Sequence, residues 1–283
     1  MPSGTSFSQH AAPGTQHALL LKGVTCSFPS RLPGAAAYTA ISAVDLRVGE
    51  GEFVSVVGPT GCGKSTLLNV AAGLLRPSSG EVVAFGSALE SINTHAGYMF
   101  QADALMPWRT ALGNVTAGLE FRGIAADEAS QRAGEWLRRV GLGAHSHKYP
   151  HELSGGMRKR VALAQTLILD PKLLLMDEPF SALDVQTRSL MENELLDLWS
   201  QDRKSVVFVT HDLEEAISLS DRVVLMSAGP ASHPIGEFAI DLPRPRDVAE
   251  VRMTSRFLEI HRMIWDALRD EVQKAYAQEL AAS

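Results

Sequence analysis

The sequence predicts an α/β fold built on a mainly parallel sheet. Short β-rich runs alternate with helical runs along most of the 283 residues, the order typical of this class. The clearest case is the run at 52–57, which leads through a glycine-rich loop into a helix expected over 65–75. Two later apolar runs, 205–209 and 222–226, flank a short helical segment at 213–219, as expected of adjacent parallel strands. We therefore expect a parallel sheet that is buried on both faces.

Helical segments interrupt and follow the predicted sheet. Strand signals stop between 102 and 149, and the stretch 127–140 has apolar residues at helical spacing, so we expect a helical subdomain at about 102–160 within a domain that spans 18–242. Residues 243–283 are expected to form a C-terminal helical extension packed on its own domain, with a partner-binding or membrane-surface helix as the alternative. One side of that helical pattern carries Val251, Phe257, Leu258, Ile264, Trp265, Leu268 and Val272.

Composition and charge exclude several classes of protein. Hydrophobic residues make up 45% of the chain and charged residues 20%, which disfavours disordered, collagen-like and disulfide-scaffold classes. A net charge of -6 gives no general attraction to phosphates, so we expect no nucleic-acid partner. Two cysteines, Cys26 and Cys62, fit a reducing compartment.

The first residues and the apolar runs predict a peripheral protein. The first 21 residues contain no Lys or Arg and are broken by prolines and glycines, so we expect a disordered tail at 1–17 rather than a signal peptide. No run approaches the ~18 consecutive apolar residues that cross a bilayer. Any membrane role is therefore expected to be peripheral.

A phosphate-binding motif follows the first predicted strand. Residues 58–66, Gly-Pro-Thr-Gly-Cys-Gly-Lys-Ser-Thr, match the P-loop spacing G-x-x-x-x-G-K-[ST] between a strand and a helix. Its glycines let backbone NH groups point inward, beside the positive end of the helix. Lys64 can reach the β- and γ-phosphates, the Ser65 hydroxyl can coordinate Mg²⁺, and Thr66 can support the α-phosphate. The predicted polyphosphate site comprises Gly58, Pro59, Thr60, Gly61, Cys62, Gly63, Lys64, Ser65 and Thr66.

Two carboxylates follow another buried strand. The run 172–176 leads into Asp177 and Glu178, which places both acids at the carboxyl end of a strand, the edge where ligands of open α/β sheets bind. Asp177 is expected to hold Mg²⁺, usually through water. Glu178 is expected to polarise the water that attacks the γ-phosphate.

The run 153–157, Leu-Ser-Gly-Gly-Met, distinguishes the chain from a generic P-loop enzyme. From about Leu20 to Met226 the chain resembles the nucleotide-binding subunits of ATP-binding cassette (ABC) transporters, and 153–157 resembles their signature sequence. Ser154, Gly155 and Gly156 at a helix start offer a hydroxyl, free NH groups and a dipole end to an anion. The resemblance implies that they clamp the γ-phosphate of ATP on the P-loop of a second copy, in a head-to-tail homodimer. The family's usual Gln is Met157 here.

Three further residues agree with that family in order and context. Gln101 resembles the loop glutamine that contacts the metal or water and links the core to the helical subdomain. Asp184, in the run 181–184, resembles the aspartate of a loop that reaches across the dimer, and His211 resembles the switch histidine that senses the γ-phosphate. The resemblance implies a RecA-like P-loop core with an N-terminal antiparallel β region. Phe28 matches the aromatic residue that stacks on adenine in that family, and Tyr38, in the same loop region, is the alternative.

The resemblance implies the ATP-hydrolysing subunit of an importer on the cytoplasmic face of the inner membrane. Its partners would be a second copy, separate permease subunits that dock near 101–110 through Leu105, Met106, Pro107 and Trp108, and, indirectly, a solute-binding protein. Four runs favour the nitrate, sulfonate and taurine branch: 106–108, 151–157, 176–184 and 244–247. A hydroxymethylpyrimidine-type thiamine-precursor importer is the alternative, because its ATPase is similar.

Two rivals belong to other classes. A soluble ABC protein of DNA repair would carry long coiled coils between the P-loop and the signature, and a translation factor would carry two cassettes. The spacing from Lys64 to Ser154 leaves room only for a compact subdomain. A regulator that binds nucleotide without hydrolysis is disfavoured by the presence of both Glu178 and His211.

Overall fold

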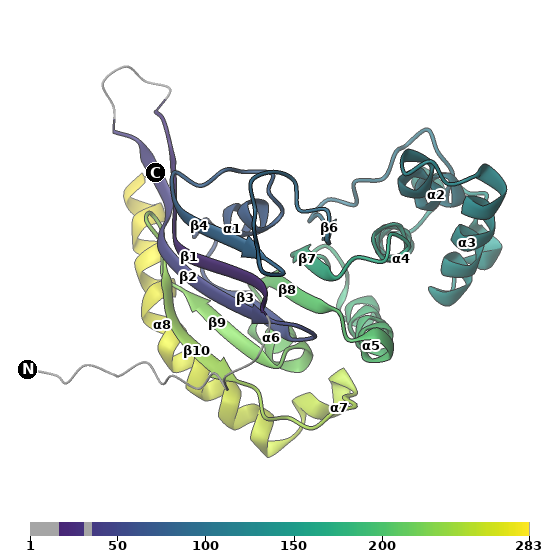
Figure 1. The fold of residues 1–283 in the computed structure, drawn as a ribbon. Coiled ribbons are helices and arrows are strands. Elements are labelled where there is room, and N and C mark those ends of the chain that lie inside the picture. Colours follow the sequence, from purple (N-terminus) through teal and green to yellow (C-terminus); the bar gives the residue numbers. More distant parts are fainter. Residues whose placement is uncertain (1–16, 31–35, 283) are drawn as a thin grey trace, which may run out of the picture.

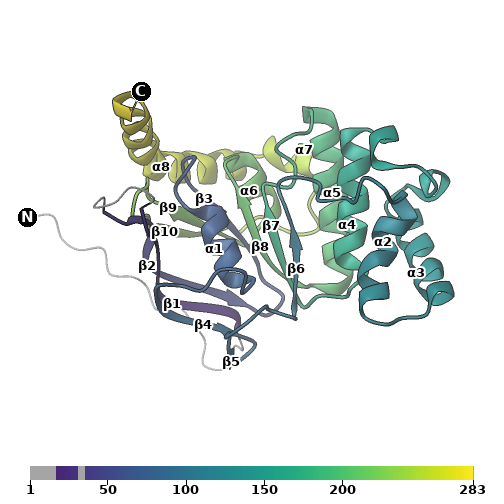
Figure 2. The same ribbon diagram turned by 90° about the horizontal axis from the view of Figure 1, so that it is seen from above.

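The computed structural model describes residues 17–30 and 36–282. This part of the chain contains two sheets, a helical lobe at one end and a long C-terminal helix (Figures 1 and 2). The predicted tail lies outside the described residues except for its last residue, His17, which begins the first strand. Among the described residues, no helix is long and apolar enough to cross a membrane.

A mainly parallel sheet forms the centre of the molecule. The strands described here are ordered β10-β9-β3-β8-β7-β6, and all pairs are parallel except the one that joins β10 to β9. Every residue of β3, β7 and β8 is buried, which explains why these strands are mostly apolar and confirms the predicted parallel sheet. The strands span Phe53–Val57 (β3), Ala96–Met99 (β6), Leu173–Asp177 (β7), Ser205–Thr210 (β8), Arg222–Met226 (β9) and Pro234–Ala239 (β10).

The predicted N-terminal antiparallel region is the second sheet. Its described strands are ordered β2-β1-β4-β5 and pair antiparallel. Buried residues of β1, β2 and β4 share one core with β3 and α1 (Lys64–Ala71), so the first helix packs between the two sheets (Figure 2). The strands span His17–Phe28 (β1), Tyr38–Gly49 (β2), Ser79–Ala84 (β4) and Ser87–Ala88 (β5).

The first helix is shorter than the predicted segment 65–75. It ends at Ala71, and Gly73 has a φ of +70°. A Cβ on Gly73 would lie 2.0 Å from the carbonyl oxygen of Ser91. Close approach of another loop therefore ends the helix here, and the local sequence pattern does not reveal that contact.

The helical lobe has its own hydrophobic core, to which Val115, Leu119, Leu137 and Val161 contribute. The helix predicted over 127–140 is α3, shifted by one residue at each end. The lobe contains α2 (Ala111–Phe121), α3 (Ala126–Arg139), two 3-10 turns η1 (Gly143–His145) and η2 (Pro150–Glu152), and α4 (Gly155–Leu167), which also packs on the central sheet.

The C-terminal extension differs from its predicted form. It contains two helices, α7 (Val248–Arg252) and α8 (Ser255–Ala282), so Val251 and Phe257 do not share one helix. The segment between the sheet and α7 is anchored by Arg246, which is buried and donates to the carbonyl oxygens of Ser220 at 2.8 Å and Leu242 at 2.9 Å. The run 243–246, Pro-Arg-Pro-Arg, is therefore held against the domain.

Only part of the predicted apolar side of the extension faces the core. Phe257, Ile264 and Leu268 are buried, whereas Leu258, Trp265 and Val272 are exposed. The buried residues pack on α6 (Leu213–Leu219), and α5 (Val185–Asp202) contacts α7 (Figure 1). The expectation that this whole side packs on the domain was wrong, because its apolar residues form two neighbouring stripes of the helix and only one of them faces the core.

Candidate functional site

The strand register brings the predicted site residues to one edge of the central sheet. Val57 pairs with Thr210, and Asp177 pairs with Val209, so β3, β8 and β7 end side by side. Met99 of β6 pairs with Met176 in the same direction. The P-loop, His211, Glu178 and Gln101 each follow one of these strand ends. Parallel pairing therefore assembles residues that are far apart in the sequence.

Close packing forces the conformation of the P-loop. Gly63 has a φ of +91°, and a Cβ there would lie 2.6 Å from Cγ2 of Ile41. A Cβ on Gly58 would lie 2.8 Å from the Sγ of Cys62 and 2.9 Å from the Cβ of Met226. Cys62 is buried and unpaired, and it helps to fix the loop. These positions require glycine, as expected of a loop whose NH groups turn inward to bind phosphate.

Lys64 places a buried cation inside the loop. Its Nζ donates to the carbonyl oxygens of Gly58 at 2.8 Å and Pro59 at 3.0 Å. A buried ammonium needs an anionic or strongly polar partner, and the loop carbonyls supply part of that need. The combination of this charge, the inward loop and the start of α1 fits a polyphosphate.

Asp177 and Ser65, the two residues expected to hold Mg²⁺, lie next to each other at the sheet edge. The side chains of Ser65 and Tyr98 lie beside the Asp177 carboxylate. Burial raises the pKa of Asp177, and the hydrogen bond from Ser65 opposes that rise. One carboxylate and one hydroxyl beside a phosphate site fit Mg²⁺, which is usually held by few protein oxygens together with phosphates and water. The sequence analysis did not include Tyr98 among the site residues. In the run 97–100, the alternation of side chains places Tyr98 on the same face of the strand as Phe100.

Glu178 is the centre of a polar triad with Gln101 and His211, the two members that only the resemblance had assigned to the site. Its Oε2 lies 3.0 Å from Nδ1 of His211 and accepts from Nε2 of Gln101 at 3.3 Å. The backbone of Glu178 has a φ of +42°, which is unusual for a residue with a side chain, and its NH donates to the carbonyl oxygen of Val209. Such backbone strain is retained where the fold over-determines a position, often at functional sites.

The signature turn has the predicted geometry but lies away from the P-loop. Ser154 caps α4 by accepting from the NH of Met157 at 3.3 Å. In Figures 1 and 2, α4 and α1 lie on opposite sides of β6 and β7. A Cβ on Gly156 would lie 2.6 Å from Cγ2 of Thr187, so the turn packs against the first turn of α5. The chain's own signature therefore does not complete its own phosphate site.

Asp184 is used as a helix cap. Its Oδ1 accepts from the NH of Thr187 at 3.0 Å, and this hydrogen bond lowers the pKa of Asp184. The cap fixes the junction between the loop 181–184 and α5. Phe28 and Tyr38 are opposite each other in the pairing of β1 and β2, and both are exposed. The structure therefore leaves either aromatic available beside the strand that contacts Gly63.

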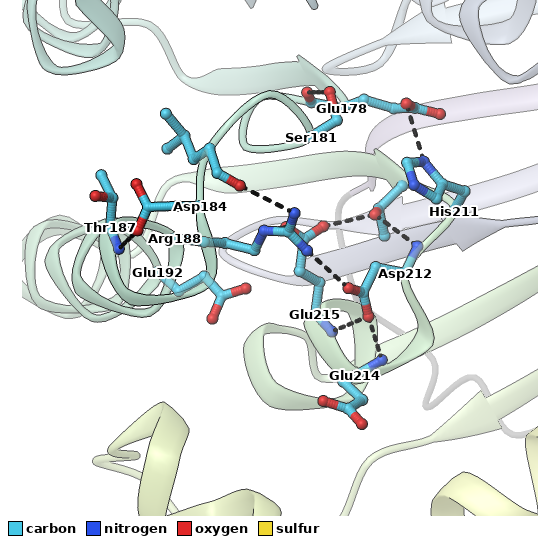
Figure 3. A network of polar contacts seen from close by, with 12 residues as sticks. Glu178, Ser181, Asp184, Thr187, Arg188, Glu192, His211, Asp212, Glu214 and Glu215 are labelled. Atoms are coloured by element: carbon cyan, nitrogen blue, oxygen red, sulfur yellow. Dashed lines mark hydrogen bonds and ion pairs between the residues drawn. The ribbon is translucent and has the colours of Figure 1, made fainter. Parts of the chain in front are cut away.

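A partly buried polar network missed by the sequence analysis joins the loop 181–184 to Asp212, the residue after His211 (Figure 3). Arg188 donates to the carbonyl oxygen of Leu183 at 3.3 Å and to Oδ2 of Asp212 at 3.0 Å. Glu215 is buried, accepts from the Thr210 hydroxyl at 2.5 Å and lies 3.9 Å from Nε of Arg188. The sequence pattern around positions 188 and 215 does not reveal these contacts, because they join residues of different elements.

A second missed contact connects the Gln101 loop to the signature helix. Lys159 is buried, and its Nζ donates to the carbonyl oxygen of Gln101 at 2.6 Å and lies 3.1 Å from Oδ1 of Asp103. Arg158 pairs with the other oxygen of Asp103 at 2.8 Å. The adjacent segment exposes Pro107 and Trp108, whereas Leu105 packs partly in the core. Only half of the predicted permease-docking run is therefore open.

Comparison with known proteins agrees with this geometry. The family model described as ABC transporter matches residues 41–181. An uncharacterised ABC transporter ATP-binding protein of Methanocaldococcus jannaschii is 48% identical over 237 residues, which are 83% of this chain and 86% of that protein. The nitrate import ATP-binding protein NrtC of Synechococcus elongatus is 40% identical over 85% of this chain, which spans 37% of its length.

A bicarbonate transport ATP-binding protein of Synechocystis, CmpC, is 43% identical over 76% of this chain and 32% of its own length. Among solved structures, the ATP-binding cassette MJ0796 has a TM-score of 0.70 and 33% identity, and the match covers 80% of this chain and all of that one. That structure is described as a dimer in a post-hydrolysis state bound to ADP and phosphate.

Proposed function

Because the chain belongs to the ABC transporter ATP-binding family, we propose that it powers an importer through ATP-driven closure of a head-to-tail homodimer. The family and the cassette fold make it an ATP-binding ATPase. The observation that carries the proposal is the triad at the sheet edge, in which Glu178 faces both His211 and Gln101 beside the P-loop.

The residues at the carboxyl edge of the central sheet would bind the phosphates of ATP, hold Mg²⁺ and activate water. Backbone NH groups of 58–66 and the Lys64 ammonium would hold the phosphates, while Ser65, Asp177 and Gln101 would hold Mg²⁺, whose charge stabilises the phosphoryl oxygens during transfer. Glu178 would orient and polarise the attacking water, and its hydrogen bond with His211 would fix the direction of the carboxylate. Phe28 or Tyr38 would stack on the adenine.

A second copy is needed because the P-loop and the signature turn lie on opposite sides of β6 and β7 (Figure 2), so one chain cannot bring both to the same ATP. The signature turn at 154–156 would clamp the γ-phosphate held by the P-loop of the partner, and Asp184 would approach the same site. Binding of two ATP molecules would close the dimer, and hydrolysis would open it. The dimeric solved cassette supports this arrangement.

Permease subunits in the inner membrane would convert this motion into solute passage and would hold the chain at the cytoplasmic face. Exposed Pro107 and Trp108, tied through Asp103 and Lys159 to the signature helix, are suited to that contact. Relatives named for nitrate and bicarbonate support a small-oxyanion importer of the nitrate, sulfonate and taurine type, served by a solute-binding protein.

The test is the Glu178→Gln variant of the full chain. Because Gln cannot accept a proton, we expect ATP turnover to fall by about 10²-fold or more while ATP binding persists and dimers accumulate. Phosphate release and sedimentation measure the two effects. Glu128→Gln, on the exposed face of α3, is the matched control and should hydrolyse normally. Unchanged turnover in Glu178→Gln would remove that residue from the mechanism.

A further inference from the structure

A cleft of about 800 Å³ separates the C-terminal helix from the phosphate-binding edge. One wall is formed by Pro59 and Thr60 of the P-loop together with His211, and the other wall is formed by α8. The match to MJ0796 covers 80% of this chain, so this chain has residues beyond the shared cassette. The cleft thus joins an element of the extension to the centre of the ATPase site.

The α8 wall of the cleft is an apolar stripe. Trp265, Val272 and Tyr276 line the cleft at helical spacing and are 42%, 37% and 63% exposed. The neighbouring stripe, which includes Ile260 and Ile264, is buried against the core and already anchors the helix. The exposed stripe is therefore not required to attach α8 to its own domain.

The proposed dimer brings a specific segment to this cleft. Within the chain, the signature turn and the first turn of α5 are packed as one unit, because a Cβ on Gly156 would lie 2.6 Å from Thr187. Val185, at the start of that helix, is 75% exposed. A partner's signature turn that covers the phosphates on Lys64 would therefore carry its Val185 toward the P-loop, whose Pro59 and Thr60 line the cleft.

We propose that α8 is a second clamp in the ATP-closed dimer, in which Trp265, Val272 and Tyr276 receive the first turn of α5 from the other copy. This inference rests on the proposed head-to-tail dimer. Two-fold symmetry places the contact twice in each dimer. Aromatic and aliphatic anchors at the edge of a polar nucleotide interface add affinity by excluding water. The extension thereby tunes how readily ATP closes the dimer without touching the nucleotide.

The affinity test uses the full chain with Glu178→Gln, so that ATP is held. We expect Val272→Ser with Tyr276→Ser to raise the dimer dissociation constant by about tenfold in sedimentation with Mg²⁺ and ATP. Met263→Ser is the matched control, since Met263 is exposed on α8 but does not line the cleft, and it should leave the constant unchanged. An unchanged or tighter dimer in the double variant overturns the proposal.

A cross-linking test identifies the occupant. One Glu178→Gln chain carries Val185→Cys, and a second, tagged to differ in mass, carries Tyr276→Cys; the natural Cys26 and Cys62 are buried. A bifunctional maleimide should give the mixed product only with ATP, and Met263→Cys in place of Tyr276→Cys should give none. A dimer without the mixed product overturns the α8 contact alone. A chain that stays monomeric with ATP overturns both the contact and the proposed function.

Discussion

Two glutamates near the phosphate-binding edge are in opposite environments. Glu178 lies at the end of β7 and reaches His211 and Gln101 through one oxygen, so its other oxygen is free to face a water. Glu215 is buried behind the switch loop, where Thr210 is its close partner. Glu178 can therefore act on a reacting group, whereas Glu215 holds the loop that carries His211.

The buried Glu215 predicts a pH dependence of stability. Burial raises its pKa from 4.5 to about 7, Glu192 and Asp212 add to the rise, and Thr210 and Arg188 oppose it. Between pH 4.5 and about pH 7, Glu215 is therefore protonated in the folded state and ionised in the unfolded state. The contribution of Glu215 to the free energy of unfolding is complete below pH 4.5, the unfolded pKa, and is lost as the pH rises through about 7. We expect the free energy of unfolding to fall on the order of 1 kcal/mol per pH unit from about pH 5 to about pH 7.

Urea unfolding of Glu215→Gln measures that share, because the amide cannot titrate. The pH slope should be smaller in this variant, with the contribution of Glu192 remaining. Glu214→Gln is the matched control, since the Glu214 side chain is 54% exposed. Identical slopes for wild type and Glu215→Gln would contradict the buried, protonated glutamate.

At the scale of elements, the predicted strands agree with the structure better than the helix ends do. A strand in a buried parallel sheet is mostly apolar, so β3, β7 and β8 are evident from composition. Helix α1 ends where Gly73 meets another loop, and the predicted C-terminal side divides between α7 and α8. Those ends depend on contacts with distant segments.

The tie between α4 and the Gln101 loop gives an element-scale prediction. Lys159→Met keeps the aliphatic packing but leaves the carbonyl oxygen of Gln101 without its donor, and we expect a loss of about 1–3 kcal/mol in the free energy of unfolding. The control is Arg158→Met, whose half-exposed ion pair with Asp103 should be worth less than about 1 kcal/mol. Equal losses in the free energy of unfolding for the two variants, measured with urea, would show that the buried hydrogen bond of Lys159 adds no stability.

At the scale of the whole molecule, the arrangement of α1 and α4 on opposite sides of β6 and β7 separates the two phosphate-binding halves (Figure 2). The P-loop can bind ATP within one copy, whereas the signature turn can act only on another copy. The polar network around Arg188 runs between these halves, from the loop 181–184 to the switch loop.

Mixed dimers test the shared site. Lys64→Ala and Ser154→Arg chains should each be inactive alone. In an equal mixture we expect about a quarter of wild-type turnover, since half of the dimers are mixed and each has one intact site of two. A chain that carries both substitutions, mixed with Lys64→Ala, is the control and should recover nothing. No recovery in verified mixed dimers would argue against sites shared between copies.

Local sequence determined the residues whose roles depend on spacing. The P-loop, the acids after β7 and the serine cap of α4 each depend on neighbouring residues. They can therefore be identified from the sequence without tertiary information. Resemblance, rather than spacing, supplied the roles of Gln101 and His211. The sequence by itself thus indicated the parallel sheet, the nucleotide chemistry and the family.

Only the tertiary structure decided which distant groups meet. Strand register brings Gln101 and His211 next to Glu178. Packing between elements buries Lys159 and Glu215, which then connect those elements. The path of α8 forms a cleft beside the P-loop. These features arise from packing between elements, and a side chain's burial or partner is not encoded in the few residues that flank it.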